Sequence, residues 1–92
     1  MKSRKRERLE ILYNVLVIIN TNKEINPTPL LRKSNLTTSR FNIYIEELIT
    51  KQLIIINFTK KGKKLIRLSE KGIEFLDKFK EIVSILEDFD IW

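Results

Sequence analysis

Residues 52–72 read QLIIINFTKKGKKLIRLSEKG, and this stretch decides the fold. Two apolar runs, 53–56 and 65–68, flank a polar segment that contains one glycine, Gly62. This pattern predicts two antiparallel strands joined by a short turn. The turn carries Lys60, Lys61, Lys63 and Lys64, which is more positive charge than chain reversal needs and suits a polyanion.

The composition limits the class of protein. Ninety-two residues with 42% hydrophobic content predict one small domain, of a size at which oligomerisation often adds stability. The absence of Cys and His excludes disulfides, zinc fingers and His-dependent acid-base catalysis. The apolar segment from Leu9 to Ile19 contains Glu10 and Asn14 and fits neither a signal peptide nor a membrane span. We therefore expect a soluble cytoplasmic protein without metal or cofactor.

The charge is distributed unevenly along the chain. The net charge is +6, but residues 1–69 hold 15 Lys and Arg against 5 Asp and Glu, whereas residues 70–92 hold 3 against 7. We expect the basic part, 1–69, and the acidic part, 70–92, to have different roles within one compact unit.

The first helix is predicted from Ser3, as its cap, to about Asn20. Its core face should carry apolar residues spaced three and four apart, namely Leu9, Leu12, Tyr13, Leu16 and Ile19. Positive charge is unfavourable at a helix N-terminus, so the basic residues there indicate either external anions or a frayed end. These candidate anion contacts are Arg4, Lys5, Arg6 and Arg8.

Two further helices precede the hairpin. Thr28-Pro29 predicts the start of a short second helix that ends near Lys33, and Ser34-Asn35 should break it. Thr37 or Thr38 should cap a third helix that runs to about Lys51, with its core face formed by Phe41, Tyr44, Ile45, Leu48 and Ile49. Two helices joined by a tight turn and followed by a hairpin define a helix-turn-helix with a wing.

The outward face of the third helix carries candidate recognition residues. Short polar and guanidinium side chains near a helix N-terminus are the types that reach base edges and phosphates. They are Thr38, Ser39, Arg40 and Asn42, and exposed Ile43 could pack on a thymine methyl or a sugar. Glu46 and Glu47 should point away from DNA or limit its approach. The alternative is that Thr37 to Ser39 only cap the helix and that Arg40 and Asn42 are solvated.

The four lysines of the turn are candidate phosphate contacts. Taken alone, a Lys-rich turn is usually a solvated loop, but its position after a helix-turn-helix favours DNA. Lysines act as flexible point charges, so they should add affinity and salt dependence more than specificity. The turn lacks the spacing and the hydroxyl of a nucleotide-binding P-loop.

Four fragments of the chain resemble a known family. They are Leu9 to Tyr13, Asn35-Leu36-Thr37, Tyr44-Ile45-x-x-Leu48 and Leu68-Ser69-Glu70-Lys71-Gly72. Their order and spacing are similar to those of small archaeal winged-helix proteins of the ten-kilodalton chromatin class, and of related archaeal and viral transcription regulators. The resemblance implies a dimeric double-stranded DNA binder with its third helix in the major groove and its wing along the backbone. In that class the last helix is a long coiled-coil arm, whereas here it is short.

The acidic end predicts a dimerisation helix. Ser69 should cap a helix to about Phe89, roughly 30 Å long, which exceeds what a small domain needs to cover itself. Part of its apolar stripe should face a second copy, in antiparallel orientation. The expected interface residues are Phe75, Phe79, Ile82, Val83, Leu86 and Phe89. The alternative is a helix that folds back to close its own core.

Together these features predict a mainly α winged helix-turn-helix of the α+β class and a dimeric, sequence-preferring DNA-binding transcriptional regulator. A chromatin protein of low specificity and a protein-interaction module remain alternatives. An enzyme is not expected, because no nucleophile-base pair, metal cluster or converging carboxylate pair is present, and neither a membrane role nor a small-molecule ligand is indicated.

Overall fold

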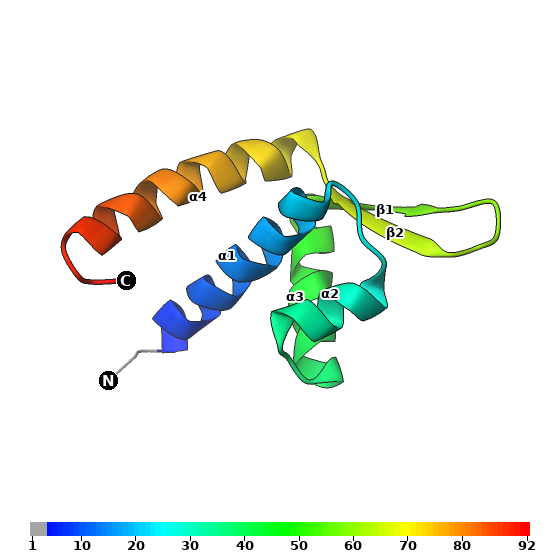
Figure 1. The fold of residues 1–92 in the computed structure, drawn as a ribbon, viewed down its shortest axis with the longest axis horizontal. Coiled ribbons are helices and arrows are strands. Elements are labelled where there is room, and N and C mark those ends of the chain that lie inside the picture. The colour runs from blue at the N-terminus through cyan, green and yellow to red at the C-terminus, as the bar shows by residue number, and fades with distance from the viewer. Residues whose placement is uncertain (1–3) are drawn as a thin grey trace.

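The computed structural model describes residues 4–92, with side chains from residue 7 onward. The expected cap Ser3 lies outside the described residues, as do the side chains of Arg4, Lys5 and Arg6. The elements follow the order expected for a winged helix-turn-helix, and they are arranged as in Figure 1. They are α1 (Arg4–Asn22), α2 (Pro27–Ser34), α3 (Thr38–Thr50), β1 (Ile54–Phe58), β2 (Lys64–Leu68) and α4 (Glu70–Asp88).

One hydrophobic core joins the helices to the hairpin. Its fully buried side chains come from every part of this assembly: Val15, Leu16, Ile19, Leu30, Leu48, Ile66 and Leu76. The predicted core faces of α1 and α3 are therefore largely correct. Two residues that were predicted on these core faces are exposed instead, Leu9 at 41% and Ile49 at 39%. Ile49 follows Leu48, the last buried residue of α3, and Leu9 precedes Leu12, the first buried residue of α1.

The second helix starts two residues earlier than its sequence predicts. Asn26 is the N-cap residue and Pro27 the first helical residue, while Thr28, the expected cap, lies inside the helix. Both Pro27 and Pro29 fit the first helical turn, where no backbone N–H is required for an intrahelical bond. The Asn26 side chain does not cap α2 but donates a hydrogen bond to the carbonyl of Lys64, at 2.9 Å.

The turn between α2 and α3 has the geometry of a tight helix-turn-helix. Asn35 adopts the left-handed conformation (φ 56°), and its N–H donates to the carbonyl of Arg32 at 3.2 Å. Thr37 then caps α3, accepting a hydrogen bond from the N–H of Arg40 at 3.3 Å. The second of the two predicted caps, Thr38, is the first residue of the helix.

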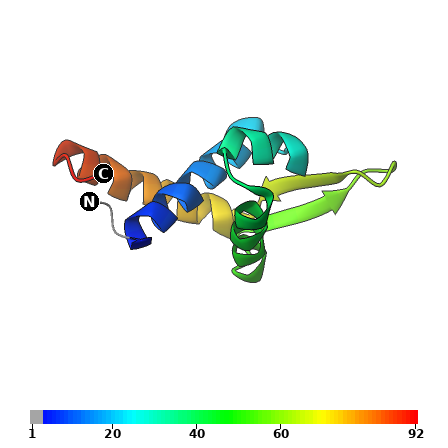
Figure 2. The same ribbon diagram turned by 90° about the horizontal axis from the view of Figure 1, so that it is seen from below.

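The hairpin forms as predicted and is anchored by a contact that the sequence pattern does not reveal. β1 and β2 are antiparallel, with Ile54 opposite Leu68 and Phe58 opposite Lys64. Ile25, between α1 and α2, forms an isolated bridge with Ile66 through N–O hydrogen bonds of 2.9 and 2.8 Å. The base of the wing is thus fixed to the α1–α2 connection, and its tip projects from the body (Figures 1 and 2).

Ser69 and Gly72 join the hairpin to α4. The Ser69 N–H and Oγ donate to the carbonyls of Leu53 and Gln52, at 3.0 and 2.7 Å, and Oγ accepts from the N–H of Gly72 at 2.9 Å. A Cβ at Gly72 would lie 2.0 Å from the Leu53 carbonyl oxygen. The start of α4 therefore packs directly on the backbone before β1, which only a glycine allows.

The last helix packs along α1 and keeps one apolar face uncovered. Phe79 and Val83 are 7% and 4% exposed, and the rings of Phe79 and Tyr13 lie 5.0 Å apart. Both were expected at an intermolecular surface. That expectation is corrected, because α4 turns these two side chains into the protomer. The exposed apolar residues of α4 include Phe75, Ile82 and Ile85, to which its C-cap residue Phe89 adds, whereas Leu86 is half-buried.

Candidate nucleic-acid interface

The N-terminal half of α3 presents an exposed polar face. Thr38, Ser39, Asn42 and Ile43 are all exposed. At 100° per residue they fall within an arc of roughly 140°, whose centre lies about 110° around the helix from the buried Phe41 and Ile45. Hydroxyl, amide and aliphatic groups are therefore available together for base edges and sugars.

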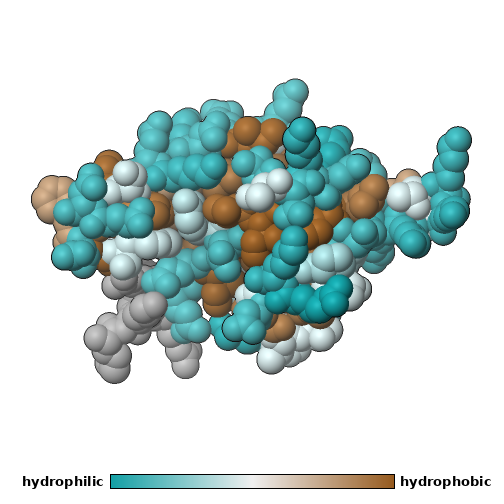
Figure 3. Space-filling view, viewed as in Figure 1, coloured by the Kyte–Doolittle hydropathy of each residue, from teal (hydrophilic) through white to brown (hydrophobic). Residues whose placement is uncertain are grey.

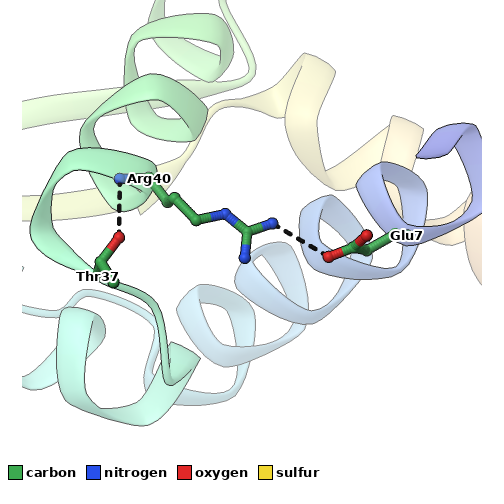
Figure 4. A network of polar contacts seen from close by, with 3 residues as sticks. All are labelled: Glu7, Thr37 and Arg40. Atoms are coloured by element: carbon green, nitrogen blue, oxygen red, sulfur yellow. Dashed lines mark hydrogen bonds and ion pairs between the residues drawn. The ribbon is translucent and has the colours of Figure 1, made fainter.

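Arg40 lies at the edge of this face and points toward α1. Its Nη2 atom is 3.3 Å from Oε1 of Glu7, and both side chains are about half exposed (Figure 4). A hydrogen bond with the Tyr44 side chain, followed by the bond with Glu7, raises the pKa of Arg40 above its ordinary value. These contacts occupy part of the hydrogen-bonding capacity of the guanidinium.

The two carboxylates expected near this face take different positions. Glu46 is exposed on the same side of α3 as Asn42 and Ile43, since it follows them by four and three residues. Glu47 is turned toward α1 and pairs with Arg8 and, at 3.7 Å, with Lys51. A polyanion on α3 would meet repulsion from Glu46 after the first two turns, so contact is favoured at the N-terminal half.

The wing tip holds its lysines away from the protein body. Lys60, Lys61, Lys63 and Lys64 are all exposed. The N–H groups of Gly62 and Lys63 donate to the carbonyl and Oγ1 of Thr59 at 2.9 and 3.1 Å, which closes the turn. Gly62 has φ 78°, a conformation that side chains disfavour, so glycine serves the backbone geometry here.

The basic N-terminal segment is only partly described. Arg8 is the one of its four candidate residues whose side chain is described, and it contacts Glu47 of α3. Arg4, Lys5 and Arg6 are in the first turn of α1, and their side chains lie outside the described residues. Arg8 and Arg40 thus both pair with acidic residues across the α1–α3 boundary.

Two open hollows flank α1. One, of about 530 Å³, is bordered by residues that include Glu7, Tyr13, Arg40 and Trp92. The other, of about 400 Å³, has walls that are mainly hydrophobic and include Leu9, Leu12, Leu48, Leu53 and Phe75. On the face shown in Figure 3, hydrophobic surface gathers in the middle of the molecule, while the wing tip is hydrophilic. Within residues 4–92, no cluster of three or more metal-ligating side chains occurs.

Sequence reasoning did not identify two residues of this region. Glu7 is a partner of Arg40, and their separation of 33 positions in the sequence conceals this contact. Phe58 ends β1 and is 65% exposed beside the wing lysines. The alternation of Ile54, Ile56 and Phe58 on one strand face was the available signal for Phe58.

The chain belongs to the winged helix-turn-helix family, which matches residues 5–87. No curated protein matches the chain in sequence. The described residues contain no helix that is both long enough and apolar enough to span a membrane.

Solved structures of DNA-binding proteins share the fold. Sso10a-2, a DNA-binding protein from Sulfolobus solfataricus, is 18% identical with a TM-score of 0.73, over 88% of this chain and 82% of its own. The transcriptional regulator BldR from the same organism is 15% identical with a TM-score of 0.78, over 89% of this chain and 60% of its own. A mutant of Escherichia coli MarR in complex with operator DNA is 16% identical with a TM-score of 0.71, over 78% of this chain. The chain spans about half the length of that MarR, at 53%. These likenesses show that the chain shares its fold with the three proteins.

Proposed function

We propose that this chain is a dimeric transcriptional regulator that binds double-stranded DNA with sequence preference. The N-terminal half of α3 would enter the major groove, and the wing would follow the phosphate backbone. The observation that carries the proposal is the exposed polar face of α3 at Thr38, Ser39, Asn42 and Ile43, next to a hairpin with four exposed lysines.

Base contacts and phosphate contacts would come from different elements. The short side chains of α3 have the hydrogen-bonding groups and the methyl groups that distinguish base pairs in the major groove. The lysines Lys60, Lys61, Lys63 and Lys64 would neutralise phosphates and release counterions, which supplies affinity without sequence information. Arg40 and the basic N-terminal residues would add contacts where α1 approaches the duplex. These N-terminal residues are Arg4, Lys5, Arg6 and Arg8.

The uncovered face of α4 supports a homodimer. Phe75, Ile82 and Phe89 are exposed and seven residues apart, so they form one stripe, to which Ile85 adds. Lys71 and Lys78 border the first half of this stripe, together with Glu74, which pairs with Lys78 at 3.4 Å. An antiparallel pair centred on Ile82 would bring the apolar residues of the two copies together. The acidic α4 pair would then stay away from the DNA surface.

The test is a salt-dependent binding measurement on the intact chain. Fluorescence anisotropy with labelled duplexes between about 50 and 200 mM salt gives the slope of log K against log salt, expected near −0.9 for each phosphate neutralised. Replacing Lys60 and Lys61 by Gln should make this slope shallower, by up to the contribution of about two neutralised phosphates. The control, Lys80→Gln, removes an exposed positive charge on the side of α4 opposite the apolar stripe and should leave the slope unchanged.

A chromatin-type role is the second candidate, and the Lys-rich wing favours it because lysines contact phosphates without reading sequence. Tight binding to unrelated duplexes with equal affinity would support this role. Weak binding to random duplexes, with a preferred site recovered by selection from a random library, would support the regulator. Absence of binding at about 50 mM salt would exclude both and leave the protein-interaction module.

A further inference from the structure

Phe58 occupies an unusual position for a large hydrophobic side chain. It is the last residue of β1, it pairs with Lys64, and it is 65% exposed. Successive side chains of a strand alternate between its faces, so Phe58 shares a face with Ile54 and Ile56. Ile54 is buried and Ile56 is half-buried against the core. Phe58 therefore continues the helix-facing side of the hairpin past the point where the helices cover it.

The charged residues around the Phe58 ring indicate what kind of molecule could contact it. Lys60, Lys61, Lys63 and Lys64 follow within six residues, and all are exposed. A surface with that much positive charge opposes the close approach of a basic or purely apolar protein surface. A nucleic-acid groove matches it, because phosphates line the rims and the deoxyribose C–H groups and base edges form the walls between them. Apolar side chains, Phe among them, enter minor grooves in this way in other DNA-binding proteins.

We propose that Phe58 is a DNA-contact residue that places its ring against the sugars and base edges of the minor groove while the wing lysines bind the flanking phosphates. The inference rests on the proposed function and gives the wing a second role. The lysines supply the salt-dependent part of the affinity. The ring supplies an apolar part that does not involve counterions and is therefore independent of salt.

The two contributions separate in one titration series. Phe58→Ala should weaken duplex binding by roughly tenfold at every salt concentration and leave the slope of log K against log salt unchanged. Phe58→Leu, which remains apolar, should retain most of the affinity. Ile73→Ala is the matched control, since Ile73 is an exposed apolar residue of α4. It lies on the opposite side of that helix from Ile82, nine residues away, and should bind like the wild type.

Photo-crosslinking locates the contact directly. A benzophenone amino acid at position 58 abstracts hydrogen from nearby C–H groups, and it should join the protein to the deoxyribose of a bound duplex. Thermal melts should show that the variants remain folded, because the Phe58 side chain is mostly exposed.

The outcomes are distinct. An Ala variant with wild-type affinity, or a crosslink to a second protein chain and none to DNA, would overturn the role of Phe58 while leaving the DNA-binding function in place. If the wild type binds no duplex, the proposed function itself fails.

Discussion

Glu7 holds Arg40 at the boundary between α1 and α3, and this contact affects how the interface would operate. The ion pair is exposed on both sides, so solvent screens it and it contributes little to folding. Its main effect would be on binding, because a phosphate has to compete with the Glu7 carboxylate for the guanidinium. The same carboxylate would also repel the DNA backbone.

Replacing Glu7 with Gln should therefore tighten duplex binding, by about three- to tenfold near 100 mM salt, with a steeper salt slope. Anisotropy titrations measure both quantities. The control is Glu81→Gln, which changes the net charge by the same amount at an exposed position of α4. Measured against Arg40→Gln alone, the Glu7→Gln/Arg40→Gln double variant should show a smaller gain, because only the repulsion between Glu7 and the backbone is then relieved. A gain of the same size in both backgrounds would show that Arg40 is not the group released.

Gly72→Ala should lower the free energy of unfolding by about 1–3 kcal/mol, because overpacking against the Leu53 carbonyl exceeds the gain in helix propensity. Urea denaturation followed by circular dichroism measures the change. Gly62→Ala is the contrast, since its Cβ would meet no atom within 4 Å and only the strain of φ 78° remains. Equal stability of wild type and Gly72→Ala would mean that α4 can move away from β1 without cost.

At the scale of elements, the pattern of the sequence was sufficient to predict all four helices, the hairpin and the cap Ser69, while it left Thr37 and Thr38 as alternative caps of α3. Local signals determine these features, namely apolar periodicity and capping hydroxyls. The Thr28-Pro29 signal misplaced the start of α2 because Asn26-Pro27 offers an equivalent start two residues earlier. No local sequence signal distinguishes these two possible starts of α2.

Features that depend on how elements meet were not predictable in the same way. The Ile25–Ile66 bridge and the Glu7–Arg40 pair join positions far apart in the chain. The burial of Phe79 depends on the angle at which α4 meets α1, which the stripe of α4 alone does not specify. For the candidate site, the sequence supplied the exposed residue types of α3 and the wing, but not the ion pair that restrains Arg40.

Asn26 should stabilise the wing through its hydrogen bond to the Lys64 carbonyl. We expect Asn26→Ala to lower the free energy of unfolding by about 1 kcal/mol, the usual contribution of one such bond. Hydrogen exchange should be faster at the amide of Ile66, which bonds to Ile25 next to Asn26. Asn57→Ala, at an exposed position of β1, is the matched control. Unchanged exchange at Ile66 would show that the Ile25 bridge holds the wing base by itself.

At the scale of the whole molecule, the protomer is elongated, with extents of 47 × 27 × 21 Å, and the wing lies at the opposite end from the C-terminal end of α4 (Figures 1 and 2). A two-fold axis through α4 would therefore place the two α3 helices far apart. Binding to one face of B-DNA requires a separation of roughly 34–36 Å or a multiple of it. The geometry of the proposed dimer would consequently determine the spacing of half-sites.

Ile82→Asp should dissociate the proposed dimer, because it places a charge at the centre of the α4 stripe, where burial would be costly. We expect the dimer dissociation constant to rise by at least about a hundredfold, as measured by sedimentation equilibrium. Ile73→Asp introduces the same charge on the opposite side of α4 and should remain dimeric. Equal masses for wild type and Ile82→Asp would contradict an interface on this stripe.

Trp92 is the only tryptophan of the chain, and its indole meets Tyr13 and Phe79 edge-on at ring-centroid distances of 5.9 and 6.2 Å. The protein therefore contains its own optical reporter at the seam between α1 and α4. Its emission reports the separation of these two helices, and Tyr13 is close enough to transfer excitation energy to it. The fluorophore lies away from the wing (Figure 1) and borders the same hollow as Glu7 and Arg40, so a change in its signal on adding a duplex would record events at the α1 end of the interface rather than contact with the wing.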